Sequence, residues 1–294
     1  MCSPYSFRTI SVSFFILLLT TYTSAMAAEF NYGQGKMILQ GGFLGLQGSV
    51  KEDITTYSLK AQHNNLFGSK VFYNYRLSWY DSKKMVNAQQ TLNSTSIPGL
   101  SSTYSLPKVD YRLQGLDVNL SLGYDFIHQG ERDFLGLGLL LGLSTPWINS
   151  NKSRSDDSFG NLSVKDTKTE LWTYKIGPML VMRKSLNTYF SLYGSLSYAF
   201  QTAHVKNTKL NLTTDVDGNF SSYDFGVRFQ PISADYKWGW LTLSPRLYAT
   251  AGIRHSQWTV KDMAIDISGQ NFPLPKSDLK FKTDTYYLGF GYDF

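Results

Sequence analysis

Cysteine is almost missing from this chain of 294 residues, in which Cys2 is the only one. Cys2 lies before the apolar run from Val12 to Leu19, whereas a lipid-modified cysteine would follow such a run. The rest of the chain has no thiol, which excludes disulfides, thiol catalysis and cysteine-ligated metal sites. The fold must therefore be held by burial and by backbone pairing.

The chain also lacks long apolar runs and a strong net charge. Its mean hydropathy of -0.23 excludes a bundle of transmembrane helices, because each helix would need about 20 apolar residues in succession. The formal net charge of +6 is small for this length and spread along the chain, so no nucleic-acid partner is expected. Aromatic residues, in contrast, make up 15% of the sequence.

The first 27 residues have the layout of a secretory signal peptide. Arg8 precedes the apolar run, and the small-residue sequence AMA follows at residues 25–27. The apolar run is too short to span a bilayer comfortably. We therefore expect cleavage after Ala27, export of the chain, and a single domain over residues 28–294.

Alternation of apolar and small or polar residues recurs along the rest of the chain. In FLGLGLLLGLS, residues 134–144, leucines at every second position share one face, as in a strand with two different sides. No helical periodicity of useful length is present. Ten strands are predicted: Lys36–Val50, Thr55–His63, Val71–Tyr80, Leu116–Phe126, Phe134–Ser144, Trp172–Met182, Phe190–Phe200, Tyr223–Phe229, Leu241–Ile253 and Thr285–Phe294.

The connections between these strands alternate in length. Short polar turns follow the even-numbered strands, and longer segments follow the third, fifth, seventh and ninth: Ser82–Lys108, Ile148–Thr167, His204–Asn219 and Thr259–Asp278. The tight first connection, Lys51–Ile54, is an exception. This arrangement predicts an all-β fold, a transmembrane antiparallel up-and-down β-barrel in which closure leaves no unpaired edge in hydrocarbon. Ten strands are expected, or twelve if Leu210–Thr214 or Ala264–Ser268 also cross the membrane.

Two details refine this prediction. Trp79, Trp147 and Trp172 have the outward parity and fall where strands meet long loops, as expected for an aromatic girdle at the outer interface. The parity of the apolar residues changes at Gly115, which predicts a glycine bulge at that point.

The final sequence YYLGFGYDF resembles the C-terminal signature of bacterial outer-membrane β-barrel proteins. Its outward residues are Tyr286, Leu288, Phe290, Tyr292 and Phe294. In that class the last strand is read by the barrel assembly machinery. The resemblance implies that machinery and periplasmic chaperones as transient partners, outer-membrane lipid and lipopolysaccharide as surroundings, and the bacterial outer membrane as location. The alternative is a secreted β-sandwich. The terminal residues of such a domain tend to fray, so alternating large side chains up to the last residue would serve no purpose there.

Charged residues of both signs have the inward parity. They either pair across the barrel and plug it or line a water-filled path. A ten-stranded barrel is narrow, so we expect a largely filled lumen. Arg228, Arg246 and Asp293 come from consecutive strands and could form a ladder. The predicted lumen-lining residues are Lys60, Arg76, Asp117, Lys175, Asp224, Arg228, Arg246 and Asp293.

Candidates for catalysis are few. His63 and His128 are expected at the turn side, which leaves His204 and His255 as weak candidates at the loop side. The neighbours His255 and Ser256 would point to opposite faces of a strand and could not act together. Strand number and length are similar to those of omptins, which are outer-membrane proteases, but no Asp-x-His sequence is present. No metal or cofactor is expected.

Three functions remain open for such a barrel. The first is a non-enzymatic surface-interaction or structural role carried by long polar loops. The alternative is a narrow pore for small solutes, and the third is an outer-membrane enzyme acting on lipid or peptide. Basic residues in the predicted loops favour the first: Lys83, Lys84, Lys152, Arg154, Lys206 and Lys209.

Overall fold

The structure is a computed structural model. It describes residues 26–43, 46–64, 66, 69–82, 86–88, 91–94, 103–105, 109–127, 133–153, 158–159, 162–163, 167–207, 212–232, 234–238, 241–261, 264–267, 270–273 and 278–294. Residues 1–25 of the expected signal peptide lie outside these ranges. Within the ranges, no helix is both long and apolar enough to cross a membrane.

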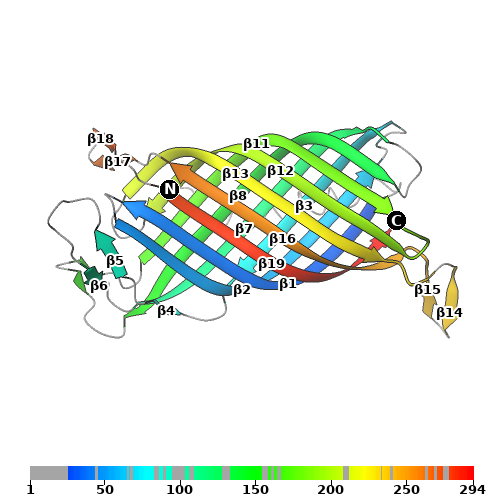
Figure 1. The fold of residues 1–294 in the computed structure, drawn as a ribbon, viewed down its shortest axis with the longest axis horizontal. Coiled ribbons are helices and arrows are strands. Elements are labelled where there is room, and N and C mark those ends of the chain that lie inside the picture. The colour runs from blue at the N-terminus through cyan, green and yellow to red at the C-terminus, as the bar shows by residue number, and fades with distance from the viewer. Residues whose placement is uncertain are drawn as a thin grey trace, which may run out of the picture.

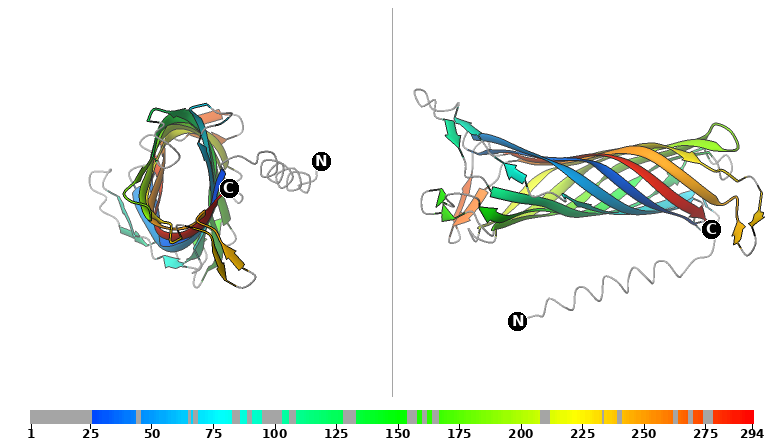
Figure 2. Two further views of the ribbon diagram at one scale, coloured as in Figure 1. Left: turned by 90° about the vertical axis from the view of Figure 1, so that its right-hand side faces the viewer. Right: turned by 90° about the horizontal axis from the view of Figure 1, so that it is seen from below.

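Ten antiparallel strands close into one barrel (Figures 1 and 2), as predicted. The last strand pairs with the first over its whole length, from Ala27 opposite Asp293 to Gly42 opposite Asp278, so the wall has no free edge. The wall strands are β1 (Met26–Phe43), β2 (Leu46–Asn64), β3 (Val71–Asp81), β7 (Val109–Asp125), β8 (Phe134–Ser153), β11 (Thr167–Ser185), β12 (Phe190–Asn207), β13 (Leu212–Phe229), β16 (Leu247–Lys261) and β19 (Asp278–Asp293).

Short strands lie beyond the two ends of the wall (Figure 1). On the loop side are β4 (Val86–Ala88), β5 (Thr91–Ser94), β6 (Thr103–Ser105), β9 (Ser158–Phe159), β10 (Leu162–Ser163), β17 (Ala264–Ile267) and β18 (Gln270–Pro273). On the turn side, near the C-terminus, β14 (Tyr236–Trp238) pairs with β15 (Leu241–Leu243). The alternative of twelve strands is wrong, because β17 pairs only with β18 and residues 212–214 begin β13.

The wall strands extend further toward the loop side than predicted. The segment Lys51–Ile54 is not a turn, because β1 and β2 stay paired until Phe43 meets Leu46. Likewise β12 and β13 stay paired until Asn207 meets Leu212, so most of the predicted loop His204–Asn219 is strand. The first connection therefore stays short, because only residues 44 and 45 separate β1 from β2, but it lies further toward the loop side than predicted.

The predicted strand Leu241–Ile253 is also wrong. Pro245 has no N–H group for a strand ladder, and the backbone N–H of Leu247 donates to the carbonyl of Ser244 at 3.0 Å, which closes a turn there. Residues before this turn form β15, and the barrel strand β16 begins only after it.

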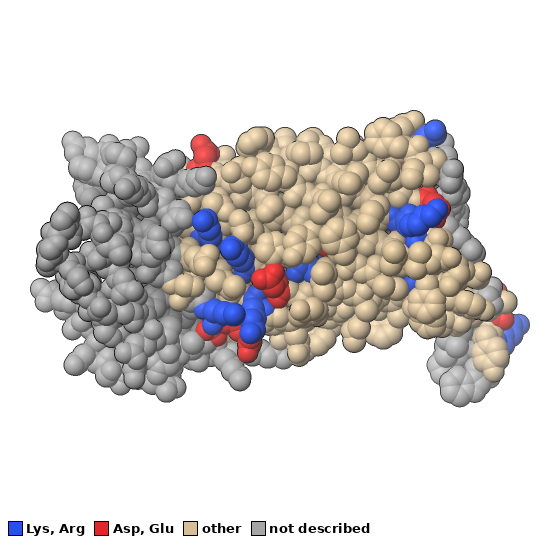
Figure 3. All heavy atoms as spheres, viewed as in Figure 1, with Lys and Arg blue, Asp and Glu red and all other residues tan. Residues whose placement is uncertain are grey.

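The outward face of the barrel carries a broad apolar band, which is almost free of charged side chains in Figure 3. Leu122, Phe200 and Tyr286 are each more than half exposed on it. At its loop-side edge Trp79 and Trp172 are exposed, and the ring of Trp147 packs edge-on against Trp79 with centroids 5.4 Å apart. The predicted tryptophans thus lie together at one boundary of the band.

The bulge predicted at Gly115 is wrong. Leu113 points into the barrel and is fully buried, on the same parity as Gly115 and Asp117, so the inward face does not change there. The register shift between β7 and β8 lies instead at Asp110 and Tyr111. Glycine is needed at position 115 for a different reason, since a Cβ atom there would lie 2.1 Å from the ring of Tyr80.

Candidate functional site

A buried ionic network fills the middle of the barrel, and its first centre is Asp117 on β7. The Nζ atom of Lys175, on β11, lies 2.5 Å from one carboxylate oxygen of Asp117. The side chains of Asn119 and Ser144 also donate hydrogen bonds to this carboxylate. Three neighbouring strands, β7, β8 and β11, therefore satisfy one buried charge.

The second centre is Asp224 on β13. The guanidinium of Arg254, on β16, donates to it from Nη2 at 2.9 Å and from Nε at 3.1 Å. The hydroxyl of Tyr287, on β19, donates to the other carboxylate oxygen. Arg76, on β3, joins the two centres, since its guanidinium lies 3.5 Å from Asp224 and 3.9 Å from Asp117. The network therefore crosses the lumen.

Cations outnumber carboxylates in this network, and aromatic faces lie against them. Lys60 lies 4.0 Å from Asp224 and 4.6 Å from the ring centroid of Tyr193. The Nζ atom of Lys175 lies 3.8 Å from the ring of Phe220. Such cation–π contacts are favourable where water is excluded. Because Asp224 is only 1% exposed, almost no solvent reaches this level of the lumen.

An apolar layer covers the network on the loop side. Trp258 is 1% exposed inside the barrel, and its indole N–H donates to Ser144 at 3.0 Å, which joins the layer to the network. Close packing of aromatic and aliphatic side chains leaves little room for water. The layer consists mainly of Met37, Ile54, Tyr80, Leu113, Leu171, Phe220, Trp258, Val260 and Phe281.

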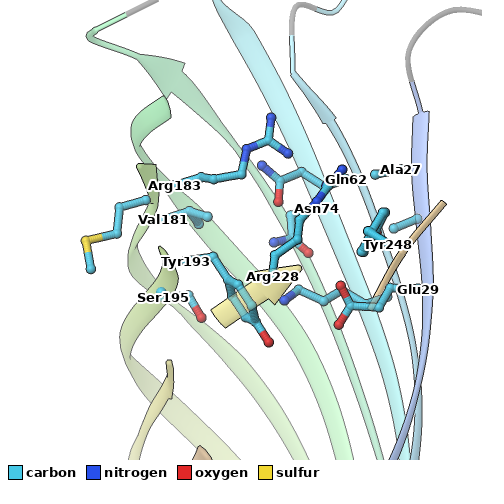
Figure 4. A pocket seen from close by; sticks show the side chains of 14 residues that line it. Ala27, Glu29, Gln62, Asn74, Val181, Arg183, Tyr193, Ser195, Arg228 and Tyr248 are labelled. Carbon is cyan, nitrogen blue, oxygen red and sulfur yellow. The ribbon is translucent and has the colours of Figure 1, made fainter. Parts of the chain in front are cut away.

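A small polar cavity lies on the turn side of the network (Figure 4). Its volume is about 40 Å³, enough for a few water molecules. Arg228 reaches it from β13, pairs with Asp293 and stacks 3.6 Å from the ring of Tyr248. The cavity is bounded by side chains from opposite walls, including Glu29, Lys60, Arg183, Tyr193, Arg228 and Tyr248.

One residue expected in the lumen lies elsewhere. Arg246 is exposed in the turn before β16, so the expected ladder contains only Arg228 and Asp293. Sequence reasoning missed Arg254 and Trp258, although both share the inward parity of β16. The other predicted residues contribute to the network just described: Lys60, Arg76, Asp117, Lys175 and Asp224.

The loop-side histidines point away from the lumen. The Nδ1 atom of His255 lies 2.6 Å from a carboxylate oxygen of Asp284, and the ring stacks on Tyr223 at 4.9 Å. Ser256 is buried inside the barrel, so the two neighbours do face opposite ways. His204 is half-buried on the outward parity. His128 lies outside the described ranges, which contain no group of three or more side chains able to hold a metal ion.

The closed wall and its outward apolar band define a β-barrel of the bacterial outer-membrane class. Among solved structures, the chain is similar to the outer membrane protease OmpT of Escherichia coli, with a TM-score of 0.62 and 9% identity over 94% of this chain and 99% of that one. This likeness shows a common fold and does not carry the protease activity over.

Two further structures match less well. For the translocator domain of the autotransporter NalP of Neisseria meningitidis, the TM-score is 0.41 and the identity 11%, over 99% of this chain and 96% of that one. For the protein Ail of Yersinia pestis, the TM-score is 0.30 and the identity 13%, over 91% and 99%. No family model and no curated protein matches the chain.

Proposed function

We propose that this protein is exported to the bacterial outer membrane and acts there as a closed scaffold, with a structural or surface-interaction role for its extracellular side. The observation that carries the proposal is the filled interior. The ionic network around Asp117 and Asp224, and the apolar layer above it, are packed across the lumen. A pore would need a continuous water-filled path at these levels.

The packing also fits a mechanical role. Side chains of the network come from strands on opposite walls, and each carboxylate has several charged or hydroxyl partners. Cross-lumen contacts of this kind hold a barrel in one shape, so that segments at its loop-side end start from fixed positions. The part of such a protein that meets external partners is its extracellular surface.

Planar-bilayer recording tests the closed interior. We expect no discrete conductance steps from folded wild-type protein, identified by its heat-modifiable migration in gels. Arg76→Ser alters the network, whereas Arg246→Ser changes an exposed turn residue and serves as the control. Steps whose anion preference changes with the first variant and not with the second would overturn the proposal and favour the pore.

The surface role needs a complementary test on whole cells. Replacing residues 154–166 and 208–211 by flexible linkers spares the wall strands, which end at Ser153 and Asn207 and resume at Thr167 and Leu212. We expect these variants to keep heat-modifiable migration and to lose adhesion to an acidic polysaccharide such as heparin. Adhesion equal to that of wild type would contradict the loop version of the proposal.

An enzymatic role has weaker support. His255 has an orienting carboxylate in Asp284, which a general base needs, but no hydroxyl nucleophile among the described residues hydrogen-bonds to its ring.

A further inference from the structure

Three lysines lie close together on the outer surface of the barrel, just beyond the loop-side edge of the apolar band. They are Lys36 on β1, Lys51 on β2 and Lys282 on β19, and we call them the outer lysine patch. Their side chains have the outward parity, and Lys36 and Lys51 are exposed. Figure 3 shows Lys and Arg side chains, with Asp and Glu side chains among them, on this face beside the apolar band.

The strand register fixes the arrangement of the patch. Ile38 on β1 is opposite both Lys51 and Lys282, so these two lysines flank it. With strands about 4.8 Å apart, their Cα atoms are about 10 Å apart. Lys36 lies two residues away on the strand of Ile38 and on the same face, about 7 Å along the chain. The three amines can therefore converge on one group of phosphate size.

The height of the patch matches the headgroup region of a bilayer. Tyr286 is 74% exposed at the upper edge of the apolar band and lies opposite Gln34, two residues before Lys36. For strands tilted by about 40°, two residues span about 5 Å along the membrane normal. Lys36 is thus about 5 Å above this ring and the other two lysines about 10 Å above it, a range that overlaps the polar layer of the membrane.

The patch also differs from two other basic positions of the rim, Arg112 and Lys168, in its lack of ion pairs. Arg112 on β7 donates to Asp81 at 2.9 Å, and Lys168 on β11 is paired with Glu170. The three patch lysines, in contrast, form no ion pair within the described part of the chain. Their charge is therefore available to an external anion.

Two carboxylates lie near the patch and limit its positive charge. Lys36 is opposite Asp53 on one side and Asp284 on the other. Asp284 is already bonded to His255 at 2.6 Å. Lys51 is two residues from Asp53 and Lys282 is two residues from Asp284, so both lysines lie further toward the loop side than these carboxylates.

We propose that the outer lysine patch binds the phosphate groups of a phosphorylated glycolipid in the outer leaflet, an inference that rests on the proposed outer-membrane placement. Below the patch, the rings of Tyr32 and Tyr57, with centroids 5.6 Å apart, continue the apolar band on which the acyl chains of the same lipid would lie. The surface is therefore complementary to both ends of an anionic lipid. Lysine clusters next to a membrane-embedded surface recognise anionic headgroups in this way.

Binding of purified rough-type lipopolysaccharide to refolded, heat-modifiable protein in neutral detergent tests the site. The test variant is Lys36→Gln/Lys51→Gln/Lys282→Gln. The control, Arg112→Gln/Lys168→Gln/Lys206→Gln, removes the same charge from the loop-side end of β7, β11 and β12. At about 1 kcal/mol per lysine near a lipid surface, the test variant should bind about 100-fold more weakly, and the control should bind within about threefold of wild type.

Two lipid controls identify the ligand chemistry. Enzymatically dephosphorylated lipopolysaccharide should bind wild type as weakly as intact lipid binds the test variant, and phosphatidylglycerol should bind no better. Equal binding of intact lipopolysaccharide to the two triple variants would overturn the site. So would binding of dephosphorylated lipopolysaccharide or of phosphatidylglycerol to wild type as tightly as intact lipopolysaccharide binds it. These outcomes are independent of bilayer conductance, which tests the closed interior, so the two proposals can fail separately.

Discussion

Asp224→Asn is the sharpest test of the interior described above. The substitution keeps the size of the side chain and removes the charge that faces Arg254, Arg76 and Lys60. Asp224 is 1% exposed, so water cannot replace the lost carboxylate. Breaking a buried ion pair by removing one partner costs about 3–5 kcal/mol, because the other charge stays buried without compensation. We expect a loss of about 4 kcal/mol in unfolding free energy.

The matched control is Asp293→Asn at the turn-side end of the barrel. Its side chain is 35% exposed, and within the described ranges Arg228 is its one ion-pair partner, so the loss should be about 1 kcal/mol or less. A double variant, Asp224→Asn/Arg254→Met, also removes the nearest of the three cations that face Asp224. It should recover about 2 kcal/mol relative to the sum of the two single changes.

The assay is urea unfolding of the barrel in lipid vesicles, followed by tryptophan fluorescence and by heat-modifiable migration. Equal m-values among the variants would show that differences in midpoint report stability. A loss below about 1 kcal/mol for Asp224→Asn, or no difference from Asp293→Asn, would refute the view that this network is dry and tightly coupled.

Two further predictions concern other parts of the molecule. Burial, with a smaller contribution from Asp53, raises the pKa of Glu52, which lies inside the barrel above the apolar band, to about 7. Since this value is above the pKa of Glu52 in the unfolded chain, the folded state binds the proton more tightly, and stability falls as the pH rises from about 5 to about 7. Glu52→Gln should abolish that fall. A pH profile of urea midpoints that is the same for this variant as for wild type would contradict the prediction. Phe294→Ala should reduce the heat-modifiable barrel recovered in outer-membrane fractions several-fold while changing in-vitro unfolding by less than about 1 kcal/mol; normal recovery in cells would exclude the assembly role of this residue.

Most strands inside the apolar band could be predicted from sequence because lipid and lumen impose opposite chemistry on alternate residues. The predicted first strand, Lys36–Val50, is wrong, since the band part of β1 carries Phe30 and Tyr32 and β1 ends at Phe43. Beyond the band the outward face meets water, whereas the inward face packs in the apolar layer with Met37 and Ile54, so the contrast of the band is reversed. Lys51, Glu52 and Asp53 therefore looked like a turn, although they continue β2 with Glu52 buried. For the same reason the ends of β12 and β13 looked like a loop.

The composition of the interior was only partly predictable. Parity identified Asp117 and Asp224, but it could not show which charges meet across the lumen, because that depends on closure. Arg246 was misplaced because Pro245 was included in a strand, and Arg254 was missed because that strand was ended one residue too early. Trp258 shares the parity of Arg254, and this was the signal for its inward position.

The pairing of β1 with β19 also has a consequence for folding. It joins strands from opposite ends of the described chain, so it has the largest loop-closure entropy of any contact in the wall. The last strand has no partner on one side until the first is in place, and both edges stay open while the chain is being made. Contacts of such long range form slowly and leave strand edges exposed to aggregation. The chain is therefore exposed to aggregation until β1 pairs with β19. A periplasmic chaperone would be needed during this interval.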